Sequence, residues 1–402
     1  MTRVSAILAV AALALGASTA NPAPAPVSAP VSAPVSARVS APVAAPVSPQ
    51  IPVALLTDLS NGQTLYSREE HRRFVPASVT KVMTAYTAFK LIEDGALALD
   101  RRYLYPPEIE KEWYAEGSNM FLRAGEQPTI AQLLLGVTTV SGNDASEALA
   151  VAALGSREAW LTQMNANAEA LGMRDTHFGS PNGYPDGGST FTTARDLAVL
   201  GQALTQNYPG LYRRFFGHRQ LTWRGLTQNN HDPVTGKVAG ADGMKTGFTY
   251  EAGYTFLGSA ERNGRRLVMV LAGAPSGAVR NASAVALLEW GFSDFEQRVL
   301  VPGAQPIGVA LVQDGAASSV ELRAPNGVVA ALPRGSGQAD YTMTIHYRGP
   351  VAAPIAAGDT IARLEVTIDG APALDIPLVA AESVAKANVF QRIANGFSDW
   401  LG

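Results

Sequence analysis

The sequence predicts an α/β domain over residues 50–296, a small all-β domain over residues 299–379 and a C-terminal amphipathic helix over residues 380–402. Three observations support this prediction. Strand-like apolar runs at both ends of the first region enclose a series of helix-period patterns. Beyond residue 299 the charge density falls, and Gly and Pro separate short apolar runs. The last stretch repeats apolar residues at helical spacing.

The first 49 residues precede the predicted domains. Residues 1–20 combine Arg3, a short apolar run and an end of small residues, which is typical of a secretory signal peptide. An uncleaved N-terminal anchor is the alternative. Residues 21–49 are a Pro/Ala/Val/Ser-rich linker with a four-residue repeat, and proline at that density disfavours helices and sheet ladders. We therefore expect a semi-rigid spacer without a core.

The α/β domain is expected to begin with a hairpin and a long helix. Residues 51–59 are apolar, and Asn61-Gly62 is a turn signal that leads into a second short strand. A helical pattern starts near Pro76 and stops at Gly95, since glycine commonly ends a helix. Further helices are expected over residues 130–140, 143–154, 157–171, 193–205 and 278–289, and strands over residues 253–260 and 266–272.

The C-terminal third is predicted from turns and from one amphipathic pattern. Turn dipeptides such as Asn326-Gly327 and Asp369-Gly370 separate short apolar runs, which indicates a β-sandwich-like domain. A terminal amphipathic helix rich in aromatic residues favours anchoring in a membrane interface, with docking on its own domain as the alternative. The apolar face of that helix comprises Val384, Ala387, Phe390, Ile393, Ala394, Phe397, Trp400 and Leu401.

Composition excludes several classes of function. The 402 residues include 31 Lys+Arg and 34 Asp+Glu, and a net charge of −3 argues against a nucleic-acid partner. The absence of Cys excludes disulfides, thiolate metal ligands and a cysteine nucleophile. The five His residues lack paired metal-ligand spacing, so we expect no metal site, and we expect no cofactor. If the chain is an enzyme, its nucleophile is a hydroxyl.

Ser78 and Lys81 stand three residues apart at the start of the first long helix. This spacing puts both side chains on one helix face. Burial or a nearby positive charge lowers the pKa of a lysine, which lets it accept a proton. Ser78 also faces the positive end of the helix dipole, which suits a developing oxyanion. The pair fits a serine nucleophile with a lysine base, although S-x-x-K alone is common on helices.

Two further motifs follow in sequence. Ser141 and Asn143 lie between two predicted helices, where a hydroxyl relays a proton and an amide holds a substrate carbonyl. Lys245 and Thr246 head a strand pattern and suit a carboxylate, and Gly247 allows a ligand backbone to approach closely. Each motif is weak alone, but the three in this order, in an exported chain, are strong evidence for acyl-transfer chemistry.

These motifs resemble those of the penicillin-binding D-alanyl-D-alanine carboxypeptidases of serine peptidase family S11, the low-molecular-mass type. The resemblance runs from about residue 50 to the end and rests on PASVTK, GSNMFL, SGNDA, TTARDLA, GMKTG and EWGF. It implies a serine β-lactamase/transpeptidase-like catalytic domain that works without a cofactor. It also implies that the all-β domain and the terminal helix correspond to the family's second domain and membrane anchor.

The resemblance assigns a role to each matching residue. Ser78 is the acylated nucleophile, Lys81 the general base, and Ser141 part of the proton relay. The backbone N–H groups of Ser78 and Phe248 form the oxyanion hole. Phe248 departs from the family, which often has His there, and Asp232 replaces an Asn in the segment before the third motif. The expected substrate-binding residues are Asn143, Lys245, Thr246, Gly247, Phe248 and Arg280.

The implied function is a serine carboxypeptidase that removes the terminal D-alanine from peptidoglycan stem pentapeptides and is acylated by β-lactams. Its expected location is the periplasm, where the C-terminal helix attaches it peripherally to the outer face of the inner membrane. A β-lactamase is the first alternative, and Glu169 is the acidic candidate for the deacylating base that it would need. A DD-endopeptidase of the same family and a catalytically silent wall-binding protein are the others.

Overall fold

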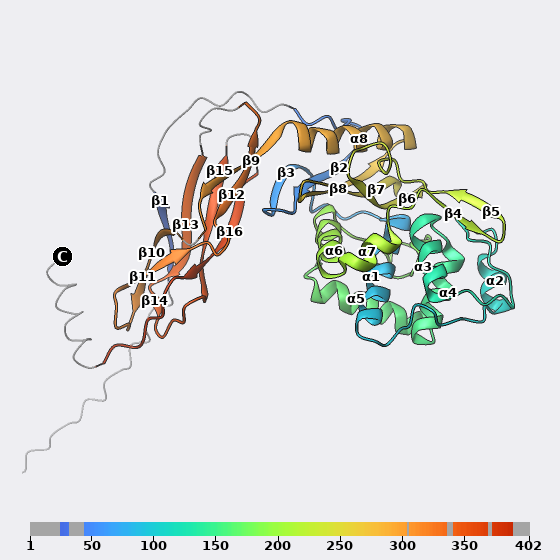
Figure 1. Cartoon of the computed structure of the whole chain (residues 1–402), viewed down its shortest axis with the longest axis horizontal. Coiled ribbons are helices and arrows are strands. Elements are labelled where there is room, and N and C mark those ends of the chain that lie inside the picture. Colours follow the sequence, from blue (N-terminus) through green and yellow to red (C-terminus); the bar gives the residue numbers. More distant parts are fainter. Residues whose placement is uncertain (1–24, 32–43, 304, 336–340, 369–371, 389–402) are drawn as a thin grey trace, which may run out of the picture.

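The computed structural model describes residues 25–31, 44–303, 305–335, 341–368 and 372–388. These residues form two bodies joined where helix α8 runs into strand β9 (Figure 1). The larger body combines a sheet with helices, and the smaller body is built from strands. The predicted α/β class of the first domain and the all-β class of the second are therefore confirmed.

The larger body is organised around a five-stranded antiparallel sheet with the strand order β3-β2-β8-β7-β6. Strand β2 is buried along its whole length because helices cover both faces of the sheet (Figure 1). Strand β6 lies at one edge, so one side of its backbone has no partner strand. The strands are β2 (Val53–Asp58), β3 (Gln63–Arg68), β6 (Ala241–Thr249), β7 (Gly253–Arg262) and β8 (Arg265–Ala274).

Helices on the two faces of this sheet have different roles. Helix α8 (Gly277–Ser293) covers one face, and a layer of helices with α1 at its centre covers the other (Figure 1). The short 3-10 turn η1 (Ala77–Thr80) leads directly into α1. The layer comprises α1 (Lys81–Glu93), α2 (Pro107–Trp113), α3 (Ile130–Thr139), α4 (Asn143–Leu154), α5 (Arg157–Ala170), α6 (Ala194–Asn207) and α7 (Pro209–Phe215).

Local signals in the sequence fix the helices that carry the site. All residues of α1 from Lys81 to Phe89 are buried, which anchors the start of this helix in the core. Thr129 and Gln132 form a reciprocal capping box that fixes the start of α3. The Ser276 side chain accepts a hydrogen bond from the Val279 backbone N–H and caps α8. The helix predicted over residues 143–154 coincides with α4 and is confirmed.

The smaller body packs a seven-stranded sheet, with the order β1-β13-β15-β16-β11-β10-β14, near a two-stranded sheet of β12 and β9. Alternate residues along β13 and β15 point into an apolar core, as the period-2 pattern requires. Its strands are β1 (Ala25–Val31), β9 (Phe295–Val301), β10 (Pro306–Gln313), β11 (Ser319–Arg323), β12 (Val328–Pro333), β13 (Tyr341–Gly349), β14 (Val351–Ala352), β15 (Thr360–Ile368) and β16 (Leu374–Ala380).

Side-chain hydrogen bonds tie the two bodies together. The fully buried Gln63 side chain of β3 donates to the Ala331 carbonyl over 3.0 Å and accepts from the Ala331 backbone N–H over 2.7 Å. Asn61 donates to the Val329 carbonyl over 3.2 Å. Ala331 belongs to the same buried cluster as the sheet face under α8. Buried residues of the second domain therefore extend the hydrophobic core of the first.

The predicted spacer differs from the structure in one segment. Residues 25–31 form strand β1, which pairs antiparallel with β13, so the expectation that proline excludes them from a sheet was wrong. Strand β1 lies at the edge of its sheet, where prolines are tolerated because one side of the strand needs no ladder hydrogen bonds. Val27 also packs against the core of the smaller body, which offsets the cost of ordering this strand.

The predicted C-terminal helix over residues 380–402 is wrong for its first part. Ala380 ends strand β16, and Val384 forms an isolated bridge with Ile355. Val384 and Ala387 are buried because this extended segment packs along the β-domain, and their apolar spacing reflects that contact. The remainder of the predicted helix, residues 389–402, and the predicted signal peptide, residues 1–20, lie outside the described residues.

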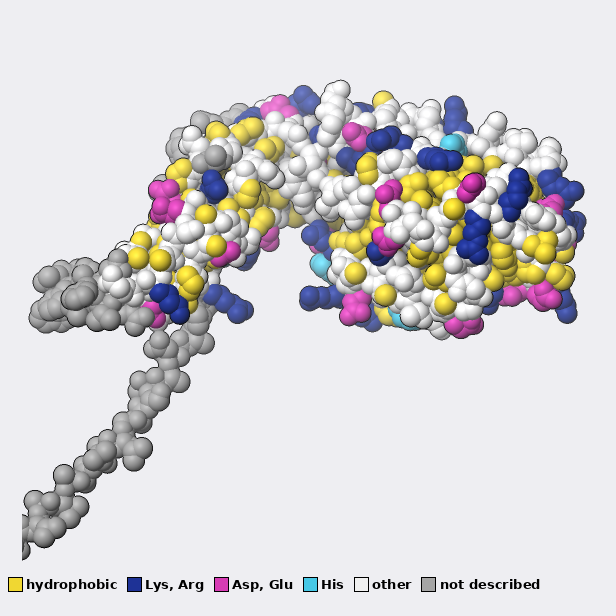
Figure 2. Space-filling model, turned by 60° about the horizontal axis from the view of Figure 1, so that its bottom comes forward, with side chains coloured by type: hydrophobic (Ala, Val, Ile, Leu, Met, Phe, Trp, Pro, Cys, Tyr) yellow, Lys and Arg dark blue, Asp and Glu magenta, His cyan; other side chains and the backbone are white. Residues whose placement is uncertain are grey.

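The distribution of charged side chains on the surface agrees with the nearly balanced net charge of the chain. In Figure 2, basic and acidic side chains are interspersed with apolar ones over the visible face of the larger body. None of the helices in the described ranges has the length and apolar character that crossing a membrane requires.

Candidate active site

The candidate nucleophile lies where η1 meets α1. Ser78 is half-buried, and the Lys81 side chain is only 1% exposed. The Lys81 Nζ donates a hydrogen bond to the Ser78 Oγ over 2.9 Å. Ala77, directly before the nucleophile, has a φ of 50°, a left-handed conformation that residues other than glycine rarely adopt. The surrounding structure therefore holds Ser78 in a strained turn, as is common at functional sites.

Three acceptors surround the Lys81 amine. Besides the Ser78 Oγ, Lys81 Nζ donates to the Asn143 Oδ1 over 2.8 Å and to the Asn182 carbonyl over 2.6 Å. An ammonium group satisfies all three with its three N–H bonds. When Lys81 loses a proton, Asn143 and Asn182 still accept its two remaining N–H bonds. The free lone pair then faces the Ser78 hydroxyl, which is the geometry that a general base needs.

The surroundings of Lys81 favour that deprotonated form. Burial lowers the pKa of Lys81 well below its ordinary value, and the nearby Lys245 charge lowers it further. Glu147 and Asp144 raise it, but the balance remains downward. Burial next to a second cation thus favours the neutral form of Lys81, which can accept the Ser78 proton.

The second motif forms the wall opposite the nucleophile. Ser141 adopts a φ of 63° in the connection from α3 to α4, and Asn143 is the first residue of α4. The Asn143 backbone N–H donates to the Ser118 carbonyl over 2.8 Å, and its Nδ2 donates to the Glu116 carbonyl over 3.0 Å. These bonds fix which end of the Asn143 amide faces Lys81. Ser141 and Asn143 both line the cavity with Ser78.

The third motif lies on edge strand β6. Gly247 packs so closely on η1 that an added Cβ would lie 2.5 Å from the Pro76 carbonyl oxygen. The Thr255 hydroxyl of β7 also donates to that oxygen over 3.1 Å. The Lys245 Nζ is buried and donates to the Thr246 carbonyl over 2.9 Å. Glycine at position 247 therefore lets β6 lie against the turn that carries the nucleophile.

The β6 side of the site is electropositive. Burial and the nearby Arg280 lower the pKa of Lys245 to about 7, and burial lowers the pKa of Arg280 to about 10. Burial also lowers the pKa of His231, helped by both cations. Arg280 and His231 line the cavity, and Lys245 lies behind Thr246. These groups gather where an anionic substrate group offsets their mutual repulsion.

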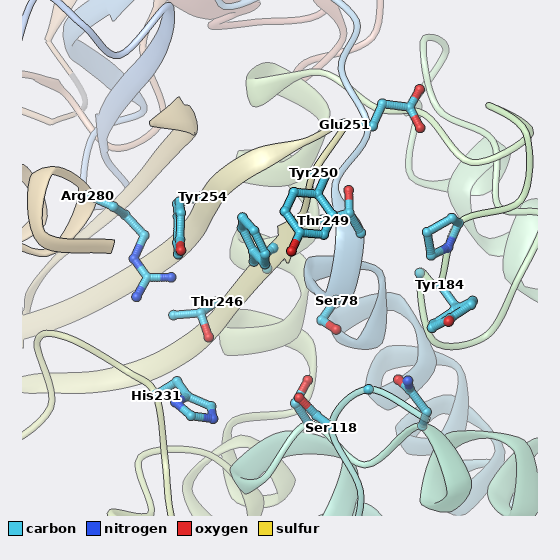
Figure 3. Close-up of a pocket in the computed structure, with 17 residues that line it drawn as sticks. Ser78, Ser118, Tyr184, His231, Thr246, Thr249, Tyr250, Glu251, Tyr254 and Arg280 are labelled. Carbon is cyan, nitrogen blue, oxygen red and sulfur yellow. The ribbon is translucent and has the colours of Figure 1, made fainter. Parts of the chain in front are cut away.

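All three motifs open onto one cavity of about 640 Å³. Figure 3 shows the Ser78 and Thr246 side chains pointing into it, with Arg280 and Tyr254 on one side and Tyr184 on the other. The predicted site residues that line the cavity are Ser78, Ser141, Asn143, Thr246, Gly247, Phe248 and Arg280. Lys81 and Lys245 lie beneath it, joined to it by the contacts above. The structure therefore brings all nine predicted residues together.

Phe248, the position where the resemblance implies His, forms part of the cavity rim. Its side chain is 44% exposed, and its ring lies 4.3 Å from that of Tyr254 and 5.6 Å from that of Tyr250, measured between centroids. The departure thus gives this chain an aromatic edge beside the cationic end of the cavity. Asp232, the other departure, accepts hydrogen bonds within its own loop from Val234 and Thr235.

The sequence analysis missed the loop that completes the Lys81 environment. Asn182 is fully buried, and its carbonyl accepts from Lys81. Gly183 has a φ of 73°, and an added Cβ would lie 1.9 Å from the Ala77 carbonyl oxygen. Tyr184 lines the cavity next to it. The Asn-Gly dipeptide is a turn signal in the sequence, but nothing local shows that this turn packs against the nucleophile.

Two carboxylates after the second motif, those of Asp144 and Glu147, are buried. Asp144 accepts hydrogen bonds from the Met120 and Leu122 backbone N–H groups, both over 2.9 Å, which is a structural role. Glu147 lies one turn further along α4, and its side chain is only 2% exposed. Burial raises the pKa of Glu147 to about 7. Its position near Lys81 could not be read from the sequence.

The arrangement supports nucleophilic acyl transfer. It combines a serine hydroxyl, a buried amine within hydrogen-bond distance, a second hydroxyl and a cationic end. Within the described ranges, no three His, Asp or Glu side chains are grouped so as to hold a metal ion.

Two family models match the two bodies of the chain. Residues 41–276 match the peptidase S11 model, described as D-alanyl-D-alanine carboxypeptidase. Residues 295–386 match the model of the C-terminal domain of penicillin-binding protein 5.

Individual relatives match over most of both chains. The D-alanyl-D-alanine carboxypeptidase DacD of Escherichia coli is 31% identical, covering 87% of this chain and 92% of the relative. DacF of Bacillus subtilis is 28% identical, covering 86% and 89%. The solved penicillin-binding protein 5 of Haemophilus influenzae superimposes with a TM-score of 0.73 at 28% identity, covering 86% of this chain and 100% of that one. The chain therefore belongs to the D-alanyl-D-alanine carboxypeptidases of peptidase family S11.

Proposed function

We propose that this chain is a serine-type D-Ala–D-Ala carboxypeptidase that releases the terminal D-alanine of peptidoglycan stem pentapeptides through an acyl-enzyme on Ser78. The observation that carries the proposal is the hydrogen bond of 2.9 Å between Ser78 and a buried lysine whose pKa is lowered. Membership of the family supports the same activity.

The contacts around Ser78 support a four-step reaction. Neutral Lys81 takes the Ser78 proton as the Oγ attacks the carbonyl carbon of the penultimate D-alanine. The backbone N–H groups of Ser78 and Phe248 receive the oxyanion, as the family resemblance implies. The proton passes through Ser141 to the leaving amine, and terminal D-alanine departs. Water then attacks the ester, so that the shortened peptide leaves and Ser78 regains its proton.

The positive charge of the site explains why it should bind a substrate with a free terminal carboxylate. The terminal carboxylate binds beside Thr246, where Lys245, Arg280 and His231 supply positive charge. A strained β-lactam carries a carboxylate at an equivalent distance from its reactive carbonyl, so it binds in the same orientation and acylates Ser78. The proposed ligands are therefore stem peptides and β-lactams.

Release of D-alanine tests the proposal. The purified protein is incubated with a pentapeptide that ends in D-Ala–D-Ala, and the products are quantified by mass spectrometry for the wild type and Ser78→Ala. We expect one D-alanine per peptide with the wild type and none with Ser78→Ala. Release that persists in Ser78→Ala, or that is absent from the folded wild type, would refute the proposal.

The alternatives differ in turnover and in substrate. Glu169, the candidate deacylating base of a β-lactamase, is exposed on α5 and lies outside the set of residues that line the cavity. Slow turnover of a chromogenic β-lactam is therefore expected, and rapid turnover would favour the β-lactamase. An endopeptidase would cleave a cross-linked peptide dimer faster than the pentapeptide. A silent wall-binding protein would form no acyl-enzyme at all.

The proposed location is the periplasm, peripherally attached to the outer face of the inner membrane. The signal-like residues 1–20 and the aromatic-rich residues 389–402 support it, and both segments lie outside the described residues. Fractionation of cells that express the full chain, or a chain lacking residues 389–402, tests it. We expect the full chain in the membrane fraction and the shortened chain in the soluble periplasmic fraction.

A further inference from the structure

A buried carboxylate lies beside the site without a place in the reaction proposed above. The Glu147 side chain points from α4 toward α5 and toward the loop at residues 180–184. Its Oε2 accepts from the Arg157 Nε over 2.8 Å, and its Oε1 accepts from the Asn182 Nδ2 over 3.1 Å. Arg157 also pairs with Glu112 on α2, over 2.7 Å. Burying an ionisable group costs free energy, so this arrangement calls for an explanation.

Asn182 connects Glu147 to the general base. Its side chain donates to Glu147, while its carbonyl accepts from the Lys81 Nζ over 2.6 Å. Its Oδ1 also accepts from the Tyr184 backbone N–H over 2.8 Å. The next residue, Gly183, packs on the Ala77 carbonyl beside the nucleophile. The position of Asn182 therefore sets the position of one of the two acceptors that orient the Lys81 lone pair.

The geometry points to Glu147 as a positioning residue for acylation. Through its hydrogen bond to Asn182 it fixes the carbonyl that holds the Lys81 amine toward Ser78, and its carboxylate places a negative charge near that amine. This inference rests on the proposed function, because it assigns Glu147 to the acylation step at the same site.

The charged groups around Lys81 shift its pKa in opposite directions. Lys245 on β6 lowers the pKa of Lys81, whereas Glu147 and Asp144 on α4 raise it. Asp144 has three backbone hydrogen bonds, from Met120, Leu122 and Ala145, which account for its burial. Glu147, by contrast, is held by the side chains of Arg157 and Asn182, and Asn182 also contacts Lys81.

The titratable groups around Glu147 come from three helices and one connection. Arg157 on α5 and Lys81 on α1 lower the pKa of Glu147, and Glu112 on α2 raises it. The phenol of Tyr105, whose pKa Glu147 helps to raise, lies on the connection to α2. Burial outweighs these charges and raises the pKa of Glu147 to about 7. Each of the two groups, Glu147 and Lys81, therefore shifts the pKa of the other.

The direction in which Glu147 shifts the pH profile of acylation follows from its negative charge. A negative Glu147 stabilises the Lys81 ammonium and delays formation of the base as the pH rises. Glu147→Gln keeps the shape and an oxygen acceptor for Asn182 but removes the charge. The rate constant of acylation at saturating β-lactam, measured from pH 5 to pH 9, rises as Lys81 loses its proton. We expect the midpoint of that rise to move to lower pH in Glu147→Gln.

A second substitution separates position from charge. Asn182→Ala keeps the Glu147 charge and the backbone carbonyl of residue 182, but it removes the side-chain amide that donates to the Glu147 Oε1. Misplacement of a catalytic group by about 1 Å costs up to about 100-fold in rate. We expect acylation by Asn182→Ala to fall about 10- to 100-fold at every pH, with the midpoint of the rise closer to that of the wild type than in Glu147→Gln.

Asp58→Asn is the matched control. Asp58 is fully buried and pairs with the Arg265 Nε over 2.6 Å, so this substitution also removes a buried carboxylate from an arginine. Asp58 lies at the end of β2, and it does not line the cavity. We expect a lower melting temperature in Asp58→Asn and an unchanged pH profile of acylation. A structural role alone would make Glu147→Gln behave in the same way.

The possible results separate the inference from the proposed function. A wild type that no β-lactam acylates refutes the proposed function. A wild type that reacts, with a Glu147→Gln profile that superimposes on its own and an Asn182→Ala rate equal to its own, refutes the positioning role. If Glu147→Gln fails to fold, the rate of acylation by Asn182→Ala decides alone. If Asn182→Ala fails to fold, the pH profile of Glu147→Gln decides alone.

Discussion

At Lys81, burial and a neighbouring cation favour the neutral form of a side chain that is ordinarily charged, which its proposed role as a base requires. The pKa of a lysine in water is near 10.5, so the amine is protonated at neutral pH. Removal from water and the charge of Lys245 both favour the neutral form. The acceptors on Asn143 and Asn182 then decide where the lone pair points. The protonation state and the orientation of the Lys81 amine therefore depend on these neighbours.

Lys81→Arg tests the base directly. Arginine keeps the positive charge, but it does not deprotonate in this pH range, so it accepts no proton from Ser78. We expect β-lactam acylation to fall about 10²- to 10⁴-fold, the range that a general base contributes. Lys90→Arg, at an exposed position on the same helix, is the control and should react like the wild type. An acylation rate in Lys81→Arg within tenfold of the wild type would contradict the assignment.

The lowered pKa of Lys245 predicts how kcat/KM changes on the alkaline side of its pH profile. Its pKa is lowered to about 7, and only the charged form attracts the substrate carboxylate. The value of kcat/KM for a carboxylate peptide should therefore fall as the pH rises through about 7, since this ratio reports the free enzyme. In Lys245→Arg the fall should move to higher pH because arginine stays charged. A wild-type kcat/KM that stays level up to about pH 9 would show that Lys245 is not the group responsible.

At the scale of elements, the site depends on three backbone segments that meet without room for side chains. Turn η1 lies between edge strand β6 and the loop at residues 180–184. Gly247 and Gly183 are the positions where an added Cβ would strike η1. A hydrogen bond of 2.5 Å from Thr84 on α1 to the Pro181 carbonyl holds the same loop. These contacts keep Ser78 in place before any substrate binds.

Gly183→Ala tests that packing. The left-handed backbone costs a residue with a side chain about 1–3 kcal/mol, and here the Cβ would also clash with the Ala77 carbonyl. We expect a lower melting temperature and slower acylation. Gly187→Ala is the matched control, because Gly187 has a similar φ of 69° but open space around its Cβ position. Equal acylation rates in the two variants would show that this loop does not position the nucleophile.

The sequence predicts those parts of the site that carry local signals. Ser78, Ser141 and Lys245 belong to motifs of three or four neighbouring residues, and all three are at the site. Asn182 and Glu147 were missed because their roles come from packing between α4, α5 and a loop. The prediction of a C-terminal helix was wrong for its first part for a related reason. The apolar spacing of Val384 and Ala387 fits an extended segment on the β-domain as well as a helix.

At the scale of the whole molecule, the cavity belongs to the larger body alone, since its lining residues run from Ser78 to Arg280. The smaller body adds its own core and joins the first through β12 and β9. Strand β1, from the segment predicted as a spacer, extends the sheet of the second body (Figure 1). We therefore expect that a substitution between the two bodies lowers the stability of the chain but leaves the rate of acylation unchanged.

Gln63→Ala tests the coupling between the bodies. This substitution leaves the buried Ala331 backbone N–H and carbonyl without their side-chain partner, at a cost of about 1–3 kcal/mol. We expect a lower melting temperature and an unchanged rate of acylation. Asn61→Ala removes one bond between the bodies, to Val329, and two local bonds to Gln63 from a half-buried position, and it should have a smaller effect on melting. A large loss of acylation in Gln63→Ala would show that the second body shapes the active site.

The central claim is that Ser78, activated by Lys81, forms the acyl-enzyme. Intact-protein mass spectrometry after brief exposure to benzylpenicillin, followed by peptide mapping, measures it most directly. We expect one penicilloyl group per chain in the wild type, located on Ser78, and no adduct on Ser78→Ala. An adduct at another residue, an adduct that persists in Ser78→Ala, or a folded wild type without an adduct would contradict the claim.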